Sequence, residues 1–165
     1  MSALRDIIGK KIIFSDGAMG TALQSAGLET GTAPEDWNIT HSDTLVNIHL
    51  SYIDAGSDII TTNTFGANIY KLESQYGVEE VVKAAIDNAK EAVKRSGREC
   101  FVALDVGPTG RLLAPMGDLS FDDAYSAFRQ EIEIGVQYGA DLIFIETMTD
   151  IYEMKAAVLA AKECC

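Results

Sequence analysis

Gly56-Ser57-Asp58-Ile59-Ile60-Thr61-Thr62-Asn63-Thr64 is the stretch of sequence that decides the fold. Its apolar centre predicts a short buried strand, and the polar residues from Thr61 onward mark the carboxyl end of that strand. A second stretch, Gly139-Ala140-Asp141-Leu142-Ile143-Phe144-Ile145-Glu146-Thr147, aligns with the first and places Asn63 and Glu146 at equivalent strand ends. A glycine and an acid before a strand are common in βα proteins, so the alignment indicates position and not ancestry.

The rest of the chain repeats the same order of strand and helix. Apolar runs predict four strands, over residues 11–16, 58–62, 100–104 and 141–145. Apolar residues at helical spacing predict helices, the first with Ser42 as its N-cap, over residues 42–55, 68–76, 79–96, 120–138 and 151–162. Strands buried on both faces that alternate with helices are typical of α/β proteins with a parallel sheet. We therefore predict four βα units in one compact domain.

The composition limits the classes of function. A chain of 165 residues with 47% hydrophobic residues is long enough to bury one core. The formal net charge of -12 creates a negative field that repels phosphate backbones and anionic lipid headgroups. Neither nucleic acid nor a membrane surface is therefore expected as a partner. No segment is apolar enough for a signal peptide or a membrane span, so we expect a cytoplasmic protein.

The cysteines and histidines provide little evidence for a metal centre or a catalytic base. Three cysteines without even spacing do not indicate a disulfide framework. Cys164 and Cys165 could supply two thiolates to zinc, but no third ligand occurs at metal-site spacing, so a helix end is the favoured interpretation. His41 and His49 lie beside or within the first long predicted helix, where we expect a surface or packing role.

Acidic and amide side chains follow the predicted strands at their carboxyl ends. Ligands of βα barrels and open α/β sheets bind at that edge. Converging carboxylates there need a cation or a proton to relieve their repulsion, and the ammonium group of a substrate would be suitable. Asp16 and Glu146 could equally cap the turns that follow them, so position alone favours neither interpretation. The four strand ends read Asp16-Gly17-Ala18, Asn63-Thr64-Phe65, Asp105-Val106-Gly107-Pro108 and Glu146-Thr147.

Four motifs extend from these strand ends, over residues 16–21 (DGAMGT), 58–67 (DIITTNTFGA), 105–110 (DVGPTG) and 144–147 (FIET). In this order they resemble the homocysteine S-methyltransferase family, particularly the homocysteine-binding module of cobalamin-dependent methionine synthases. The resemblance covers nearly the whole chain. It implies that residues 1–165 form the N-terminal half of a homocysteine-binding (β/α)8 barrel of the TIM type, that is, a half-barrel with only the first four βα units.

The resemblance also implies roles for the residues at the strand ends. Asp16 and Glu146 would hold the ammonium group of homocysteine, and backbone groups at Gly17 and Ala18 would receive its carboxylate. Two further residues would line the same pocket, which makes the predicted substrate site Asp16, Gly17, Ala18, Asn63, Thr64 and Glu146. No catalytic residue and no metal ligand is predicted within the chain.

The chemistry of the family depends on groups that the resemblance places outside this chain. In the family, zinc held by three cysteines keeps the homocysteine thiol as a thiolate, and in methionine synthases the methyl donor is methylcobalamin on a cobalamin-binding module. The family's ligands lie in the second half of the barrel, and Cys164-Cys165 do not match their Gly-Gly-Cys-Cys-Gly context. We therefore predict a homocysteine S-methyltransferase that forms methionine, of which this chain is the substrate-binding, catalytically incomplete half.

Two other functions stay open. Because open strand edges invite pairing, the chain could be an interaction module that completes its barrel with a complementary C-terminal half-barrel or by self-association. It could also be an amino-acid-binding protein without catalysis.

Overall fold

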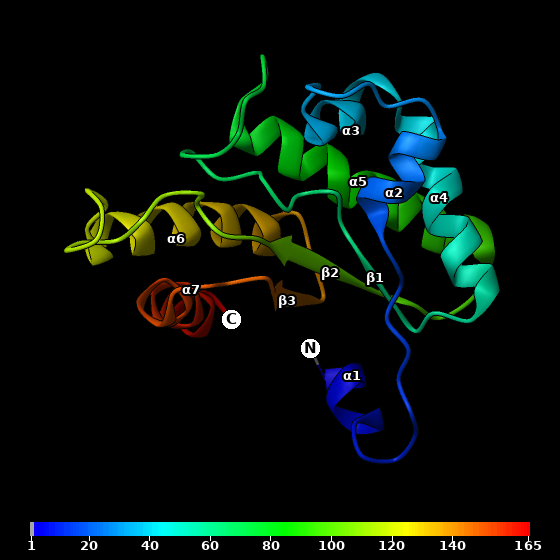
Figure 1. Ribbon diagram of the computed structural model, residues 1–165. Coiled ribbons are helices and arrows are strands. Elements are labelled where there is room, and N and C mark those ends of the chain that lie inside the picture. The colour runs from blue at the N-terminus through cyan, green and yellow to red at the C-terminus, as the bar shows by residue number, and fades with distance from the viewer. Residues whose placement is uncertain (1) are drawn as a thin grey trace.

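The computed structural model describes residues 2–165. Their strands form one parallel sheet in the order β1-β2-β3, with β2 in the middle. Figure 1 shows α4, α5 and α6 running along the sheet, whereas α1 lies apart from the other helices. The elements are α1 (Ser2–Ile7), α2 (Met19–Ser25), the short 3-10 helix η1 (Pro34–Asp36), α3 (Trp37–Thr40), α4 (Ser42–Ala55), β1 (Ile59–Thr61), α5 (Val78–Ser96), β2 (Phe101–Val106), α6 (Phe121–Gln137), β3 (Leu142–Ile145) and α7 (Ile151–Cys164).

The α/β class and the parallel sheet predicted from the sequence are confirmed. The last three predicted strands are present, and their ends lie within two residues of the prediction. Thr61 pairs with Ala103, and Asp105 pairs with Phe144, so the three strands finish at the same edge of the sheet. The long helices after residue 78 are also present, and Ser120 caps α6 by accepting the backbone N–H of Asp123 at 3.0 Å.

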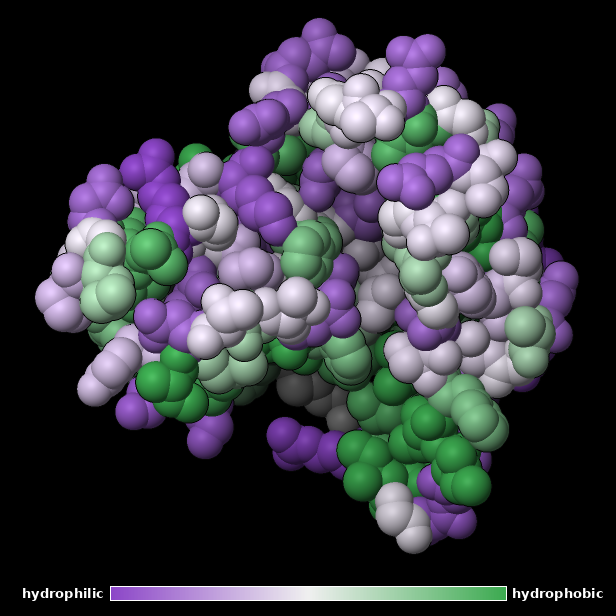
Figure 2. Space-filling model, in the orientation of Figure 1, coloured by the Kyte–Doolittle hydropathy of each residue, from purple (hydrophilic) through white to green (hydrophobic). Residues whose placement is uncertain are grey.

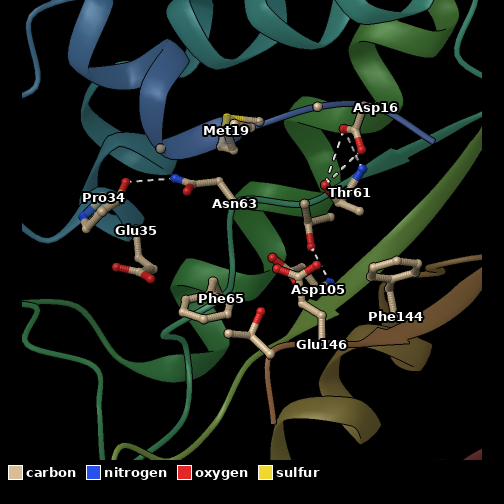
Figure 3. Close-up of a pocket in the computed structure, with 15 residues that line it drawn as sticks. Asp16, Met19, Pro34, Glu35, Thr61, Asn63, Phe65, Asp105, Phe144 and Glu146 are labelled. Carbon is tan, nitrogen blue, oxygen red and sulfur yellow. Dashed lines mark hydrogen bonds between the residues drawn. The ribbon is translucent and has the colours of Figure 1, made fainter. Parts of the chain in front are cut away.

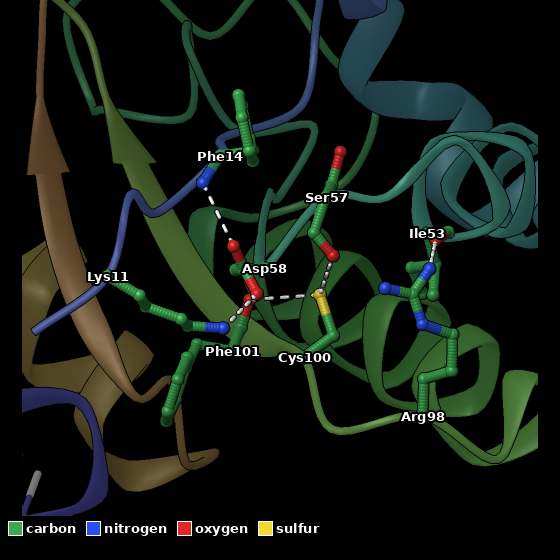
Figure 4. Close-up of polar contacts among 8 residues, drawn as sticks. All are labelled: Lys11, Phe14, Ile53, Ser57, Asp58, Arg98, Cys100 and Phe101. Atoms are coloured by element: carbon green, nitrogen blue, oxygen red, sulfur yellow. Dashed lines mark hydrogen bonds and ion pairs between the residues drawn. The ribbon is translucent and has the colours of Figure 1, made fainter. Parts of the chain in front are cut away.

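The predicted first strand, residues 11–16, is wrong as a strand. The segment lies beside β1, but a single parallel bridge between Ser15 and Ile59 is its only ladder contact among the described residues. The Phe14 carbonyl accepts the N–H groups of both Asp58 and Ile59, at 2.8 and 3.1 Å. The Phe14 N–H in turn donates to the Asp58 carboxylate at 3.0 Å, where a regular ladder would use a carbonyl (Figure 4). Four complete βα units are therefore not confirmed.

The predicted helix over residues 68–76 is also wrong, because the segment forms successive turns that do not continue as a helix. The Asn68 side-chain oxygen accepts the N–H groups of Tyr70 and Lys71, at 3.1 and 3.2 Å. The Ser74 hydroxyl accepts the N–H of Tyr76 at 2.9 Å. Ser42 begins α4 rather than capping it, since its hydroxyl donates to the Asn88 side chain at 2.5 Å.

The core lies between the sheet and the long helices. Fully buried Val82 and Ile86 of α5 and Phe128 of α6 pack with Leu104 of β2 in its largest cluster. Gly135 lets α6 approach the sheet, because a Cβ there would lie 2.5 Å from a Leu104 methyl group. The middle strand is therefore covered closely, and its carboxyl end is held in one position.

The two outer sides of the sheet are covered less well. These margins are β3 on one side and residues 11–16, beside β1, on the other. β3 has a strand neighbour on one side only, and all four of its residues are partly exposed. Ile12 and Phe14 are 76% and 60% exposed. Figure 2 shows hydrophobic residues gathered over α1 and the segment that follows it. None of the helices in residues 2–165 is long and apolar enough to cross a membrane.

Candidate functional site

A cavity of about 560 Å³ lies at the carboxyl ends of the strands, beneath the start of α2 (Figure 3). Four carboxylates line it, from Asp16, Glu35, Asp105 and Glu146. Apolar side chains, among them Phe65 and Phe144, form much of the remaining wall. The sheet thus brings together acids that lie far apart in the sequence, around a space large enough for a small molecule.

Asp16 is held in place by β1. Its carboxylate accepts the backbone N–H of Thr61 at 2.8 Å and the Thr61 hydroxyl at 3.1 and 3.2 Å. Burial raises the pKa of Asp16, while these hydrogen bonds from Thr61 act in the opposite direction. The side chain is therefore fixed in orientation, and its unused lone pairs remain available to a cation in the cavity.

Gly17 and Ala18 line the cavity where the chain turns into α2. A Cβ at Gly17 would lie 3.0 Å from a ring carbon of Tyr52, and the Tyr52 hydroxyl donates to the Ala18 carbonyl at 3.2 Å. Ala18 is the N-cap residue of α2 and has no side chain that could accept the first N–H groups of the helix. The backbone at this turn is thus exposed to the cavity.

Asn63 and Thr64 occupy different positions, although the sequence predicts both for the pocket. Asn63 lines the cavity, and its side-chain nitrogen donates to the Pro34 carbonyl at 2.7 Å and to Asn38 at 3.2 Å. Thr64 is fully buried and is absent from the lining. Its hydroxyl donates to the Asp105 carbonyl at 2.7 Å, so it holds a neighbouring acid in place.

Glu146 follows β3 and extends its pairing, because its N–H donates to the Val106 carbonyl at 3.1 Å. Its carboxylate accepts no hydrogen bond from residues 2–165 and lines the cavity. Thr147, the next residue, has a φ of 58°. This left-handed conformation is rare for a β-branched residue and often occurs at binding sites, where the surrounding structure maintains it.

Asp105 is a cavity residue that the substrate assignment from sequence omits. The sequence places an acid at this strand end, but only the fold reveals its surroundings. The residue is 9% exposed, and its Oδ1 atom has no hydrogen-bond partner in residues 2–165. Burial raises the pKa of Asp105 to about 7, with further contributions from the negative charges of Glu146 and Asp16.

Glu35 also lines the cavity, but it has a structural partner. Its Oε1 atom accepts the Gly66 N–H at 2.8 Å, and a Cβ at Gly66 would lie 2.6 Å from that oxygen. This contact fixes η1 against the segment after β1. Glu35 is consequently a weaker candidate for ligand binding than Asp105 or Glu146.

The two histidines have packing or surface roles, as the sequence predicts. His49 is fully buried in α4, and burial lowers its pKa to about 4. His41 is exposed and stacks on Trp37 with ring centroids 4.1 Å apart. Neither lines the cavity, so neither is placed to act there as a base.

The described residues do not fit a zinc centre. Within residues 2–165 no group of three or more His, Cys, Asp or Glu side chains could hold a metal ion. Burial raises the pKa of Cys100 to about 11, and its thiol lies 3.6 Å from the Ser57 carbonyl, away from the cavity (Figure 4). Cys164 and Cys165 end the chain at α7, where burial raises the pKa of both thiols.

Residues 13–165 match the homocysteine S-methyltransferase family. The chain belongs to this family. It is 30% identical to the methionine synthases of Mycobacterium tuberculosis and Mycobacterium leprae, over 172 and 174 residues. Each alignment covers 96% of this chain and 14% of the relative, so the chain spans about one seventh of the length of these methionine synthases.

A solved homocysteine methyltransferase has a similar fold. The oxidised form of the Escherichia coli homocysteine methyltransferase MmuM aligns with a TM-score of 0.83 at 21% identity, over 97% of this chain and 61% of that chain. The metallated form of MmuM aligns with a TM-score of 0.80 over 97% of this chain and 62% of that chain. The sheet and helices described above therefore share their fold with part of MmuM.

Proposed function

We propose that this chain provides the amino-acid recognition site of a homocysteine S-methyltransferase of the methionine synthase type. The observation that carries the proposal is the group of carboxylates at adjacent strand ends, which face one cavity beside an exposed backbone turn. An α-amino acid presents an ammonium and a carboxylate on the same carbon. A site with acids on one side and backbone N–H groups on the other is complementary to this pair of charges.

In the proposed complex, Asp16 and Glu146 hold the ammonium group of homocysteine. The hydrogen bonds from Thr61 keep Asp16 oriented before the ligand arrives, which reduces the entropy lost on binding. Gly17 and Ala18 receive the substrate carboxylate through their backbone, and Asn63 lines the same cavity. Thr64 contributes indirectly, through its hydrogen bond to the backbone of Asp105.

The proposed reaction moves a methyl group to the thiol sulfur of homocysteine and gives methionine. A new carbon–sulfur bond forms, the bond between the methyl group and its donor breaks, and the thiol proton is lost. The methyl carbon gives up no proton, so the acids of this cavity are needed for charge and position only. The described residues do not offer a zinc ligand set, and we therefore assign them substrate binding and no step of thiol activation.

The methyl donor belongs to the proposal as well. We infer that it is methylcobalamin on a cobalamin-binding module, because the relatives of 30% identity are methionine synthases of which this chain spans 14%. The chain alone should then bind substrate without turnover. We also expect a cytoplasmic location, as for methionine biosynthesis of this kind. Methionine formation from methylcobalamin should be undetectable with this chain and should arise when the second half of the family's barrel is supplied.

Isothermal titration of the chain tests the recognition step. L-Homocysteine and L-methionine should both bind, since they share the α-amino acid group. The analogue of homocysteine that lacks the amino group should bind at least about tenfold more weakly, because hydrogen bonds to charged groups contribute roughly 1.5–3 kcal/mol. Equal affinity for this analogue would contradict recognition of the ammonium group, and absence of all binding would overturn the proposed function.

A second candidate is a half-barrel interaction or amino-acid-binding module without catalysis. An apolar groove of about 370 Å³ favours it, since the groove lies between α1, β3 and α7 at the free edge of the sheet. Leu4, Ile8, Leu142 and Val158 are among its lining residues. A complementary C-terminal half-barrel or a second copy of the chain would cover this edge. Sedimentation velocity over a range of protein concentrations distinguishes self-association from a monomer that needs another partner.

A further inference from the structure

Asp105 occupies the central position among the acids of the cavity. It lies at the carboxyl end of the middle strand, with Asp16 beside β1 on one side and Glu146 after β3 on the other. Asp105 pairs with Phe144, and Glu146 lies two residues further along the same strand direction, so both side chains are directed to the same face. Figure 3 shows the two carboxylates close together in the cavity.

The backbone of Asp105 is fixed by a closed set of hydrogen bonds. Its N–H donates to the Thr62 hydroxyl at 3.1 Å, and its carbonyl accepts the Thr64 hydroxyl at 2.7 Å. The two threonine hydroxyls are themselves 2.7 Å apart and share a hydrogen bond. The main chain is thus well satisfied, whereas the side-chain Oδ1 atom has no partner in residues 2–165. A buried oxygen without a partner is costly unless it carries a proton or meets a ligand.

The charges around Asp105 favour its protonated form when no ligand is bound. Lys71 lies over the Phe65 ring, 3.8 Å from its centroid. Its positive charge lowers the pKa of Asp105, whereas several neighbouring acids raise it. Burial and the neighbouring acids raise the pKa of Asp105 to about 7, and Lys71 lowers it by less. The titratable groups that face Asp105 come from the N-terminal loop, η1, the turns after β1, α6 and the end of β3, and are Asp16, Glu35, Lys71, Glu131 and Glu146.

We propose that Asp105 is a third carboxylate for the substrate ammonium, and that it accepts the ammonium by giving up a proton. The inference rests on the proposed function, because it concerns the same cavity. A bound ammonium supplies the positive charge and the hydrogen-bond donors that the proton supplies in the empty site. Glu131 is also fully buried, and burial raises its pKa well above its usual range, which favours its neutral form.

The exchange makes ligand binding dependent on pH in a defined direction. The ammonium competes with the proton on Asp105, so affinity rises as pH rises through the pKa of the ligand-free Asp105 and then levels off. For a group that titrates near neutral pH, the affinity should increase about tenfold between about pH 6 and about pH 8. At about pH 7 the binding of one ligand should release about half a proton.

Calorimetric titration with L-methionine tests the coupling, because this ligand has no thiol to ionise and its ammonium stays charged over the same range. Titrations at about pH 7 in two buffers of different ionisation enthalpy give the number of protons released. Asp105→Asn should release none, show an affinity that does not change between about pH 6 and about pH 8, and bind roughly ten- to a hundredfold more weakly at the higher pH. Glu99→Gln, a change at an exposed acid outside the cavity, should behave as the unmodified chain does.

The outcomes separate this inference from the proposed function. Binding without proton release, or proton release that persists in Asp105→Asn, overturns the inference and leaves amino-acid recognition intact. Absence of binding at every pH overturns both. If Asp105→Asn does not fold, carbon-13 spectra of the aspartate carboxyl groups in the unmodified chain still decide. No aspartate titrating near neutral pH, or one whose titration is unaffected by L-methionine, would contradict the inference.

Discussion

The carboxyl end of the sheet and its margins differ in how firmly their side chains are held and in how well they are covered. At the carboxyl ends of the strands, Thr61, Thr62 and Thr64 hold Asp16 and Asp105 with short hydrogen bonds around a defined cavity. Along the margins, Ile12 and Phe14 are 76% and 60% exposed, and β3 has one free edge. The cavity is therefore built by contacts among residues at the carboxyl ends of the strands, and these contacts do not require the margins to be covered.

This difference assigns substrate recognition and association to different regions of the molecule. The proposed substrate recognition depends on side chains at the carboxyl ends of the strands. Association depends on apolar surface at the margins, which an additional layer of protein would bury. Variants in the two regions should consequently change different measurements.

The largest expected effect comes from the core between α6 and the sheet. Phe128→Ala removes a fully buried ring that packs between α6 and the sheet, and it should lower the free energy of unfolding by about 3–5 kcal/mol. Phe14→Ala removes the same ring from a side chain that is 60% exposed at the margin, and it should change that free energy by less than about 1 kcal/mol. Urea denaturation followed by circular dichroism measures both variants, and similar losses for the two would break the comparison.

A smaller effect is expected in the cavity itself. Glu146→Gln keeps the shape of the side chain and removes its charge, so the dissociation constant for L-homocysteine should rise about ten- to a hundredfold. The free energy of unfolding should change little, because the carboxylate has no hydrogen-bond partner to lose in residues 2–165. Calorimetric titration and urea denaturation of the same samples check the two parts. A large loss of stability with unchanged affinity would show that Glu146 is a structural residue.

The sequence predicts the middle of this fold better than its margins. The strand centres follow from continuous apolar runs, and α5 follows from one long apolar face. Residues 11–16 have an equally apolar run, but the Asp58 side chain takes the Phe14 N–H, and no sequence period reveals that contact. Residues 68–76 form turns in place of the predicted helix, and the Ser74 hydroxyl takes the N–H of Tyr76, which a helix would direct to the carbonyl four residues back.

The candidate site shows the same limit. Five of the six predicted substrate residues line the cavity, because the carboxyl ends of parallel strands meet at one edge. Thr64 does not, since it is turned toward the Asp105 backbone. The binding role proposed for Asp105 could not be predicted, because it depends on burial, on an oxygen without a partner and on neighbouring charges from several elements. These are properties of the assembled sheet and not of any one motif.

The smallest expected effect is at the margin, where Lys11 and Asp58 form an ion pair with 2.6 Å between Nζ and Oδ1 (Figure 4). The Lys11 side chain is 50% exposed, so Lys11→Met should lower the free energy of unfolding by less than about 1 kcal/mol. Asp58→Ala should cost more, about 1–3 kcal/mol, because it also leaves the Phe14 N–H without its acceptor and frees the segment beside β1. Urea denaturation gives both values, and hydrogen exchange of the Phe14 amide should accelerate in Asp58→Ala but not in Lys11→Met. Equal effects of the two changes would mean that the ion pair, and not the hydrogen bond to the backbone, holds the first segment against the sheet.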